Sequence, residues 1–350
     1  MKNPFLSYIH NFRGLAIILI VGVHCRTSLE WPEDSLVHAI LIAVLDSSTI
    51  LFVFITGFLF QHLNATGFSY YGYISKKVNY VAIPYLLVSI PAILARLLFE
   101  TKVYWMDSFY TNLYPPFQIL YMLLTGKHSG PFYFIPMIFL IFISAPVLFR
   151  LQKTSYFTLI MAGIVTLGLF TYTYGYYASI AESFLYFVPV YLFGMWVSRN
   201  KDFILNMNSV VLCSLIVGYG AIFYLEITKQ IMIERLHFFE ITPHYFTTTF
   251  NWSKLKEMIL AVILLTAFYR FRKKNFKYLT LLGSFSFGIY FIHIYFISGI
   301  GYLFRTFQLS NAQNGLGFLV LIAVIITLST ITVYLIKKIF KEKSRFFIGS

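Results

Sequence analysis

The sequence predicts an all-α polytopic membrane protein, and three observations support that prediction. Hydrophobic residues make up 59% of the 350 residues, charged residues only 11%, and the mean hydropathy is +0.75. Soluble globular domains carry about 25% charged residues. Apolar stretches of about 20 residues, the length that a helix needs to cross a bilayer, recur along the chain. No shift in composition divides residues 1–350, so we expect a single integral-membrane domain.

A window of about 19 residues finds about ten predicted spans. They cover residues 9–27, 36–61, 78–99, 131–151, 156–175, 184–199, 208–226, 255–271, 279–304 and 315–338. The stretch from Pro116 to Leu124 is too short to cross a bilayer, and we interpret it as an interfacial or re-entrant piece.

The orientation follows from the distribution of Lys and Arg between alternate loops, because cytoplasmic loops carry the excess. The termini and the loops that share their side hold 17 of the 27 Lys and Arg residues, and the opposite loops hold 8. We therefore expect both termini in the cytoplasm, which requires an even number of spans. The long pieces 100–130 and 227–254 then lie outside, and their aromatic content predicts packed binding caps or interfacial belts.

The net charge of +14 is interpreted through the membrane rather than through nucleic acid. In a membrane protein, basic loops are attracted to an anionic leaflet of the bilayer. No nucleic-acid-binding module is visible, so no nucleic-acid partner is expected. The two cysteines, Cys25 and Cys213, have no pairing or metal-ligand spacing, and no metal is expected.

The first span places an arginine and a histidine in an apolar run, FRGLAIILIVGVHC. Arg13 and His24 are eleven positions apart, close to three helical turns, so they share one face roughly 16 Å apart. Ionisable groups inside a membrane segment are costly and are usually functional. The structural alternative is that Arg13 extends to the interface and His24 marks the end of the helix.

Two further groups of polar residues lie at matching depths. Lys76 and Lys77 open the third span on the cytoplasmic side, where they either determine topology or join Arg13 in a basic vestibule for an anionic ligand. In the ninth span, polar or small positions recur every three or four residues and make one stripe. That stripe consists of Gly283, Ser286, Tyr290 and His293, the last at a depth comparable with His24.

The order of these motifs resembles the acyltransferase family 3 membrane proteins. The resemblance rests on Arg13 and His24, followed by FITGFLF, KKVNYVAIPY, FYFIPMIF, YFVPVYLFGMW and GSFSFGIYFIH in this order. It covers nearly the whole chain. Within the family, the chain is most similar to the branch associated with biofilm exopolysaccharides, including the intercellular-adhesin C type, which implies a multi-pass protein of the bacterial plasma membrane.

The resemblance implies transfer of an acyl group, usually acetyl, from cytoplasmic acyl-CoA to a hydroxyl of a cell-surface polysaccharide. Arg13 and His24 match the family's arginine and catalytic histidine. Lys77 matches the first position of its paired basic motif, whereas the second position falls at Tyr80. Thr56 stands where the family usually has serine before glycine. A polysaccharide acceptor and its synthase machinery are the partners that this assignment implies.

The chemistry of these residues suits acyl transfer. A sugar hydroxyl is a poor nucleophile at neutral pH, and His24 is the side chain suited to accept its proton as a general base. The polyanionic end of acyl-CoA needs a basic mouth, which Arg13, Lys76 and Lys77 provide. Four side chains are candidates to orient His24 or to stabilise the oxyanion. They are His293, Tyr290, Ser286 and Thr56.

Two other classes of function remain open from the sequence. A polysaccharide exporter or flippase predicts a wide polar path along several spans, whereas only Arg13, Asp46 and Arg96 clearly lie within predicted spans. A small-molecule transporter predicts inverted repeats and helices broken by Gly or Pro in matching halves, and neither is visible.

Overall fold

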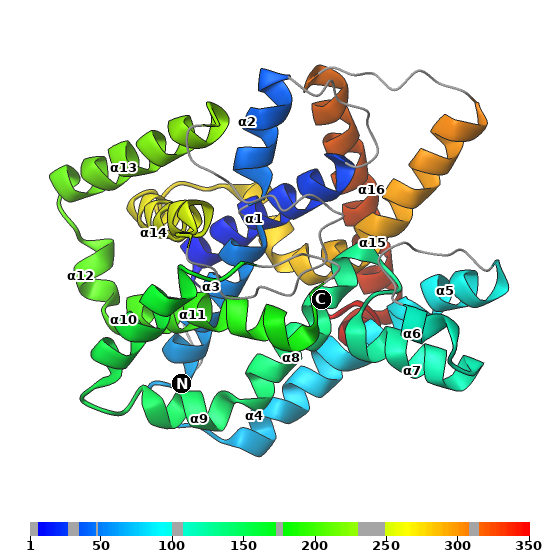
Figure 1. Ribbon diagram of the computed structural model, residues 1–350, viewed down its shortest axis with the longest axis horizontal. Helices are drawn as coiled ribbons and strands as arrows, with labels where there is room; N and C mark the ends of the chain where they lie inside the picture. The colour runs from blue at the N-terminus through cyan, green and yellow to red at the C-terminus, as the bar shows by residue number, and fades with distance from the viewer. Residues whose placement is uncertain are drawn as a thin grey trace.

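The computed structural model describes residues 6–26, 35–46, 48–99, 108–172, 178–229, 249–307 and 315–350. Within these ranges the chain folds into helices and contains no β-strand (Figure 1). The all-α prediction is confirmed for the described residues. Parts of the outer pieces predicted to form caps, residues 100–107 and 230–248, lie outside them.

Seven helices or helix runs in the described residues are long and apolar enough to cross a membrane. They are α1 (Ser7–Arg26); α2 (Leu36–Leu45) with α3 (Ser48–Asn64); α4 (Tyr70–Lys77), a π-helical turn (Val78–Ala82) and α5 (Ile83–Leu98); α11 (Ile180–Arg199); α13 (Ser209–Ile227); α15 (Lys277–Thr306); and α16 (Gly315–Phe340) with a 3-10 turn (Lys341–Lys343) and α17 (Ser344–Ile348). The protein is therefore a multi-pass membrane protein, as predicted.

One bent pair of helices is also apolar and long enough when taken together, either as a broken span or as a re-entrant loop. Helix α7 (Pro115–Thr125) meets the run Gly130–Ile143, which a 3-10 turn (Gly130–Tyr133) and α8 (Phe134–Ile143) form, at an angle of 72°. Gly126 ends α7 with φ +70°, a conformation that glycine adopts without steric cost. The stretch predicted as a short interfacial or re-entrant piece is thus a helix of 11 residues, followed by a sharp bend.

The remaining predicted spans differ in length or charge. Helix α10 (Phe157–Gly168) has 12 residues where the sequence predicted 156–175, and α14 (Trp252–Arg270) carries three charged residues in its first turns. Neither passes the simple test of length and apolarity, so the count of ten remains a prediction. The short helices are α6 (Ser108–Thr111), α9 (Ala145–Leu151) and α12 (Lys201–Leu205).

Two helix pairs form the centre of the bundle, and glycines bring each pair together. On α1 and α15, a Cβ at Gly14 would lie 2.1 Å from the Leu279 carbonyl oxygen, and one at Gly283 would lie 1.9 Å from that of His10. Helices α3 and α11 meet in the same reciprocal way, through Gly57 of α3 and Gly194 of α11. Small residues allow this close backbone approach between membrane helices. The pair α1 and α15 carries most of the candidate site.

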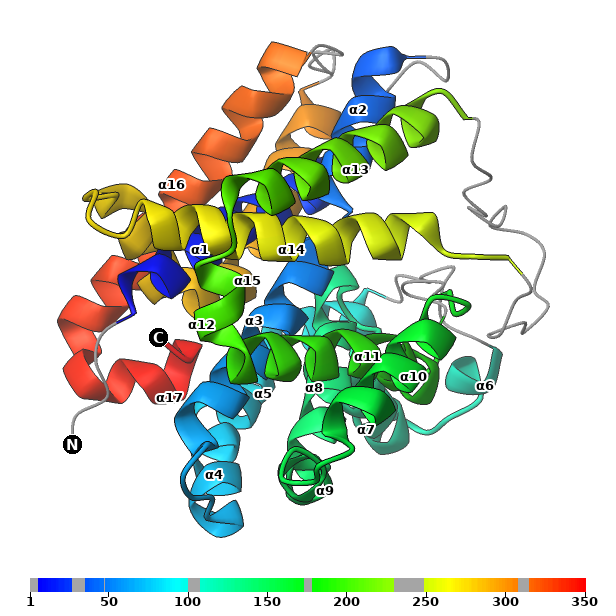
Figure 2. The same cartoon turned by 90° about the vertical axis from the view of Figure 1, so that its left-hand side faces the viewer.

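The bundle has two distinct ends. In Figures 1 and 2, which share a vertical axis, α2 and the start of α16 lie at the top, whereas α4 lies at the bottom. The starts of α2 and α16, both predicted to face outside, therefore lie far from α4, which is predicted to lie on the cytoplasmic side. This relative placement agrees with the predicted threading, and the side of the membrane on which each end lies remains a prediction.

Candidate functional site

Arg13 on α1 and Ser286 on α15 form the first polar contact of the site. A guanidinium nitrogen of Arg13, Nη2, donates to Ser286 Oγ at 2.7 Å, and Ser286 Oγ donates in turn to the Gly283 carbonyl at 3.0 Å. Ser286 is fully buried and Arg13 partly buried. The bond fixes one end of the guanidinium, while Arg13 forms no ion pair with a carboxylate of the described residues. Its positive charge is therefore uncompensated by the described protein.

The histidine pair, His24 on α1 and His293 on α15, forms the second contact. The two ring centroids lie 5.3 Å apart, and His293 is fully buried. His293 Nδ1 lies 2.7 Å from the Tyr290 carbonyl oxygen and 3.1 Å from that of Ile289. Carbonyl oxygens only accept hydrogen bonds, so Nδ1 carries the proton and Nε2 of the neutral ring is an acceptor. This Nε2 has no hydrogen-bond partner in the described residues.

Tyr290 lies between the histidine pair and the bent helix pair. Its hydroxyl donates to the Pro131 carbonyl at 2.5 Å, and its ring centroid lies 6.1 Å from that of His293. Because the phenolic proton is already engaged with Pro131, Tyr290 is better placed to position His293 than to donate to an oxyanion.

Thr56 forms a hydrogen bond within its own helix, α3. Its hydroxyl donates to the Phe52 carbonyl at 2.8 Å, one turn back on α3. The neighbouring Gly57 packs against the Tyr191 carbonyl of α11. The hydrogen bond of Thr56 thus lies within α3, next to the glycine that brings α3 and α11 together.

Of the two predicted lysines, Lys77 lies near Arg13. The positive charge of Arg13 acts on Lys77, and the Lys77 ammonium lies 4.3 Å from the Phe142 ring centroid and 5.2 Å from that of Tyr73. Lys76 is exposed. The structure thus places Lys77 near Arg13 and leaves Lys76 on the surface, and the ligand of these lysines remains a prediction.

A buried polar network around α14 was not predicted. Lys254, assigned to an outer loop from the sequence, is fully buried. Its ammonium donates to the carbonyls of Gly168 and Tyr186, both at 2.8 Å, and to Thr171 Oγ1 at 3.1 Å. Lys254 thereby joins the Thr171 hydroxyl, which donates to the same Gly168 carbonyl at 2.7 Å, in capping the end of α10.

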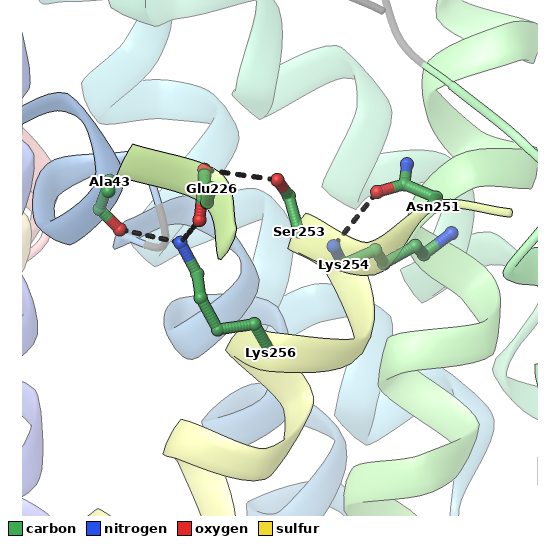
Figure 3. Close-up of polar contacts among 6 residues, drawn as sticks. All are labelled: Ala43, Glu226, Asn251, Ser253, Lys254 and Lys256. Atoms are coloured by element: carbon green, nitrogen blue, oxygen red, sulfur yellow. Dashed lines mark hydrogen bonds and ion pairs between the residues drawn. The ribbon is translucent and has the colours of Figure 1, made fainter. Parts of the chain in front are cut away.

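Lys256 makes the second part of this network. Figure 3 shows its ammonium reaching Glu226 and the Ala43 carbonyl, the latter at 2.8 Å. Ser253 Oγ donates to Glu226 at 3.1 Å. These contacts join α2, α13 and α14. A hydropathy window could not find them, because the charges that make the network also lower the apparent apolarity of α14.

The turn after α7 holds a second unpredicted contact. His128 Nδ1 lies 2.9 Å from the Met122 carbonyl oxygen, and Nε2 lies 2.8 Å from Ser89 Oγ. Both side chains are buried. Arg96, which lies within a predicted span, donates to the His128 carbonyl at 3.3 Å. These bonds hold the turn that presents the Pro131 carbonyl to α15.

Asp46, predicted to lie in a span, forms an ion pair with Arg26, the last residue of α1. The distance from Asp46 Oδ1 to Arg26 Nη1 is 3.6 Å. In the described residues, no group of three or more His, Cys, Asp and Glu side chains could hold a metal ion. The polar positions that remain for a ligand are thus those of α1, α15 and the end of α4.

The family model for the acyltransferase domain, Acyl_transf_3, matches residues 6–335. No curated protein and no solved structure matches the chain. The matched region includes α1 and α15 with their two polar contacts, as well as the bent pair and the network around α14. The match covers nearly the whole chain, which therefore belongs to the Acyl_transf_3 family of membrane acyltransferases.

Proposed function

We propose that this protein moves an acyl group, most simply acetyl, from cytoplasmic acyl-CoA to hydroxyls of a cell-surface or exopolysaccharide glycan at the outer face of a bacterial plasma membrane. The family supports acyl transfer. The observation that carries the rest is the placement of the histidine pair and the Arg13–Ser286 contact on the same two helices. Eleven helical positions put His24 roughly 16 Å beyond Arg13.

In the proposed reaction, His24 is the general base. The acceptor oxygen attacks the thioester carbonyl, its proton passes to His24, and a C–O bond forms as the C–S bond breaks. His24 then returns the proton to the departing thiolate, which leaves as the thiol of CoA. Such proton transfer contributes about 10² to 10⁴ in rate.

His293 fits the role of a positioning residue. With its proton held on Nδ1 by two carbonyls, Nε2 offers a buried lone pair beside the His24 ring. In the proposed reaction His24 turns to donate to this acceptor, a bond that the described residues do not contain, and its other nitrogen takes the proton from the hydroxyl.

About three helical turns from the histidine pair, Arg13 and Lys77 suit the anionic part of the acyl-CoA donor. An arginine binds phosphate through its planar fork, and a lysine acts as a point charge. The pantetheine arm of acyl-CoA is long and thin, so it suits the interval between these cations and His24. In this proposal Ser286 holds Arg13 in place, and the role of Lys76 is limited to topology.

The experiment that tests this function uses protein in lipid nanodiscs, [14C]acetyl-CoA and the polysaccharide isolated from a strain that lacks the gene. Transfer of label to alkali-labile esters on the polymer, with stoichiometric release of CoA, is the expected result. A deletion strain should still secrete the polymer, but without these esters. Polymer trapped inside the cell would instead identify an exporter.

A further inference from the structure

The C-terminal helix α17 brings an arginine to the segment that follows Lys77. The Arg345 guanidinium lies 5.8 Å from the Tyr80 ring centroid, and the Phe346 ring centroid lies 5.7 Å from it. Tyr80 belongs to the π-helical turn Val78–Ala82, which begins directly after Lys77. Such π-helical turns are frequent at functional sites. The turn that follows Lys77 is thus contacted by Arg345, which is far away in the sequence.

The position of α17 is fixed by contacts of the residues on either side of Arg345, namely Ser344, Gly349 and Ser350. The backbone N–H of Gly288 donates to Ser350 Oγ at 2.8 Å, and Ser344 Oγ donates to the Ser350 carbonyl at 3.0 Å. Gly349 has φ +69°, and a Cβ there would lie 2.7 Å from the Tyr80 carbonyl oxygen. Only glycine fits such a position without strain. These contacts anchor α17 on α15 only two residues beyond Ser286, the partner of Arg13.

Two of these cations, Arg13 and Lys77, lie near each other, and α17 brings the third, Arg345, to the turn that follows Lys77. We call Arg13, Lys77 and Arg345 the basic cluster. None of the three forms an ion pair with a carboxylate in the described residues. Arg345 is exposed, whereas Arg13 and Lys77 are partly buried. A cluster of like charges without acidic partners is unfavourable by itself and favours an anionic ligand.

We propose that Arg345 binds a phosphate of the adenosine-phosphate end of the acyl-CoA donor. The proposal rests on the proposed function and deepens it. An exposed guanidinium, held by stacking on Tyr80, presents its remaining N–H groups in the fork that suits a phosphate. Lys77 and Arg13 lie deeper, where the rest of the donor enters. Arg345 lies outside residues 6–335, the part that the family model matches, so the assignment concerns this chain.

The test measures equilibrium binding of acetyl-CoA to purified protein in nanodiscs made of phosphatidylcholine alone. Arg345→Gln should weaken binding by about tenfold, since a hydrogen bond to a charged group contributes roughly this factor or more. Acetyl-phosphopantetheine, which lacks the adenosine half, should bind the variant and the wild type equally. Arg345→Lys should retain part of the affinity. A Lys variant as weak as the Gln variant would show that charge is not involved and would overturn the proposal.

The matched control is Arg272→Gln. Arg272 is also an exposed arginine over a tyrosine ring, 4.1 Å from the Tyr269 ring centroid, but it lies after α14. Its loss should leave acetyl-CoA binding unchanged. Equal binding by wild type and Arg345→Gln overturns the inference but not the proposed function, whereas a wild type that binds no acetyl-CoA overturns both. An effect seen only in nanodiscs with phosphatidylglycerol would assign Arg345 to a lipid headgroup and overturn the donor assignment.

Discussion

The hydroxyl of Tyr290 lies 2.5 Å from the carbonyl oxygen of Pro131 and links the helix of His293 to the turn between α7 and α8. The same turn is held from its other side by His128, whose ring contacts Ser89 and the Met122 carbonyl. The bent pair therefore supports the proposed catalytic helix through one hydrogen bond. This bond is simple to remove without changing the shape of the side chain.

The first prediction concerns this bond. Tyr290→Phe should lower kcat about tenfold through a looser histidine pair, because a lost hydrogen bond to a buried carbonyl costs about 1–3 kcal/mol. The KM for acetyl-CoA should stay near that of the wild type. Tyr295→Phe is the control, since Tyr295 also donates to a carbonyl, that of Val88 on α5, one turn beyond the site. Equal losses in both variants would show a general effect on packing.

The second prediction is topological. Tags at the C-terminus and in the segment from Arg270 to Lys277 should report the cytoplasm, because this side carries the excess of Lys and Arg. Tags near Ser108 and Pro243 should report the outside. Accessibility of single cysteines to an impermeant maleimide provides the measurement. Labelling of the Arg270 segment in intact cells would reverse the proposed directions of donor and acceptor.

The third prediction concerns Arg13. Arg13→Ala should raise the KM for acetyl-CoA or abolish turnover, and Arg13→Lys should rescue only partly, because a point charge replaces a planar fork. Ser286→Ala should cause a smaller increase in KM, since it removes only the 2.7 Å bond that orients the guanidinium. Wild-type kinetics in Arg13→Ala would reduce this residue to an interfacial anchor.

Depth along a helix was the part of the site that the sequence could predict. The rise per residue is fixed, so His24 and His293 were expected at matching levels, and their rings do lie side by side. The bond between Arg13 and Ser286 could not be predicted, because it depends on how α1 and α15 cross. That crossing is set by Gly14 and Gly283 against opposing carbonyls, which is a property of the pair.

The network around α14 shows where the sequence argument fails. Lys254 was assigned to the outer piece 227–254, and Lys256 to the first residues of the predicted span 255–271, because each charge lowers the hydropathy of its window. Their burial is explained only by partners on other helices, such as Glu226 of α13. A hydropathy window averages residues that are neighbours in the sequence, so it cannot include a charged partner on another helix. The same limit applies to α10, whose last carbonyl, that of Gly168, accepts from Lys254 and Thr171 rather than from a longer helix.

The fourth prediction follows from the burial of the ion pair between Lys256 and Glu226. Lys256→Met alone should destabilise the protein by about 3–5 kcal/mol, because it leaves the Glu226 carboxylate buried without its cation. The double variant Lys256→Met, Glu226→Leu should recover most of the loss. Thermal unfolding in nanodiscs, followed by tryptophan fluorescence, measures both. A double variant as unstable as the single one would mean that the charges themselves are required.

The last prediction concerns the histidine pair and separates catalysis from export. His24→Ala should leave protein level and acetyl-CoA binding near those of the wild type, yet reduce acyl transfer by about 10² to 10⁴. His293→Ala should lower kcat less, because His24 remains as a base and only its orientation is lost. His62→Ala is the control, a histidine that stacks on Phe58 of α3.

Both the amount and the ester content of secreted polymer should be measured in the same strains. The enzyme hypothesis expects normal secretion with few esters in His24→Ala, and an intermediate ester content in His293→Ala. Normal esters on polymer from His24→Ala would refute its role as the base. Polymer retained inside the cell would instead support an exporter, because removing a general base leaves no reason for the polymer to stay inside. The order of the two losses also tests the tautomer argument, since a positioning residue cannot cost more than the base that it positions.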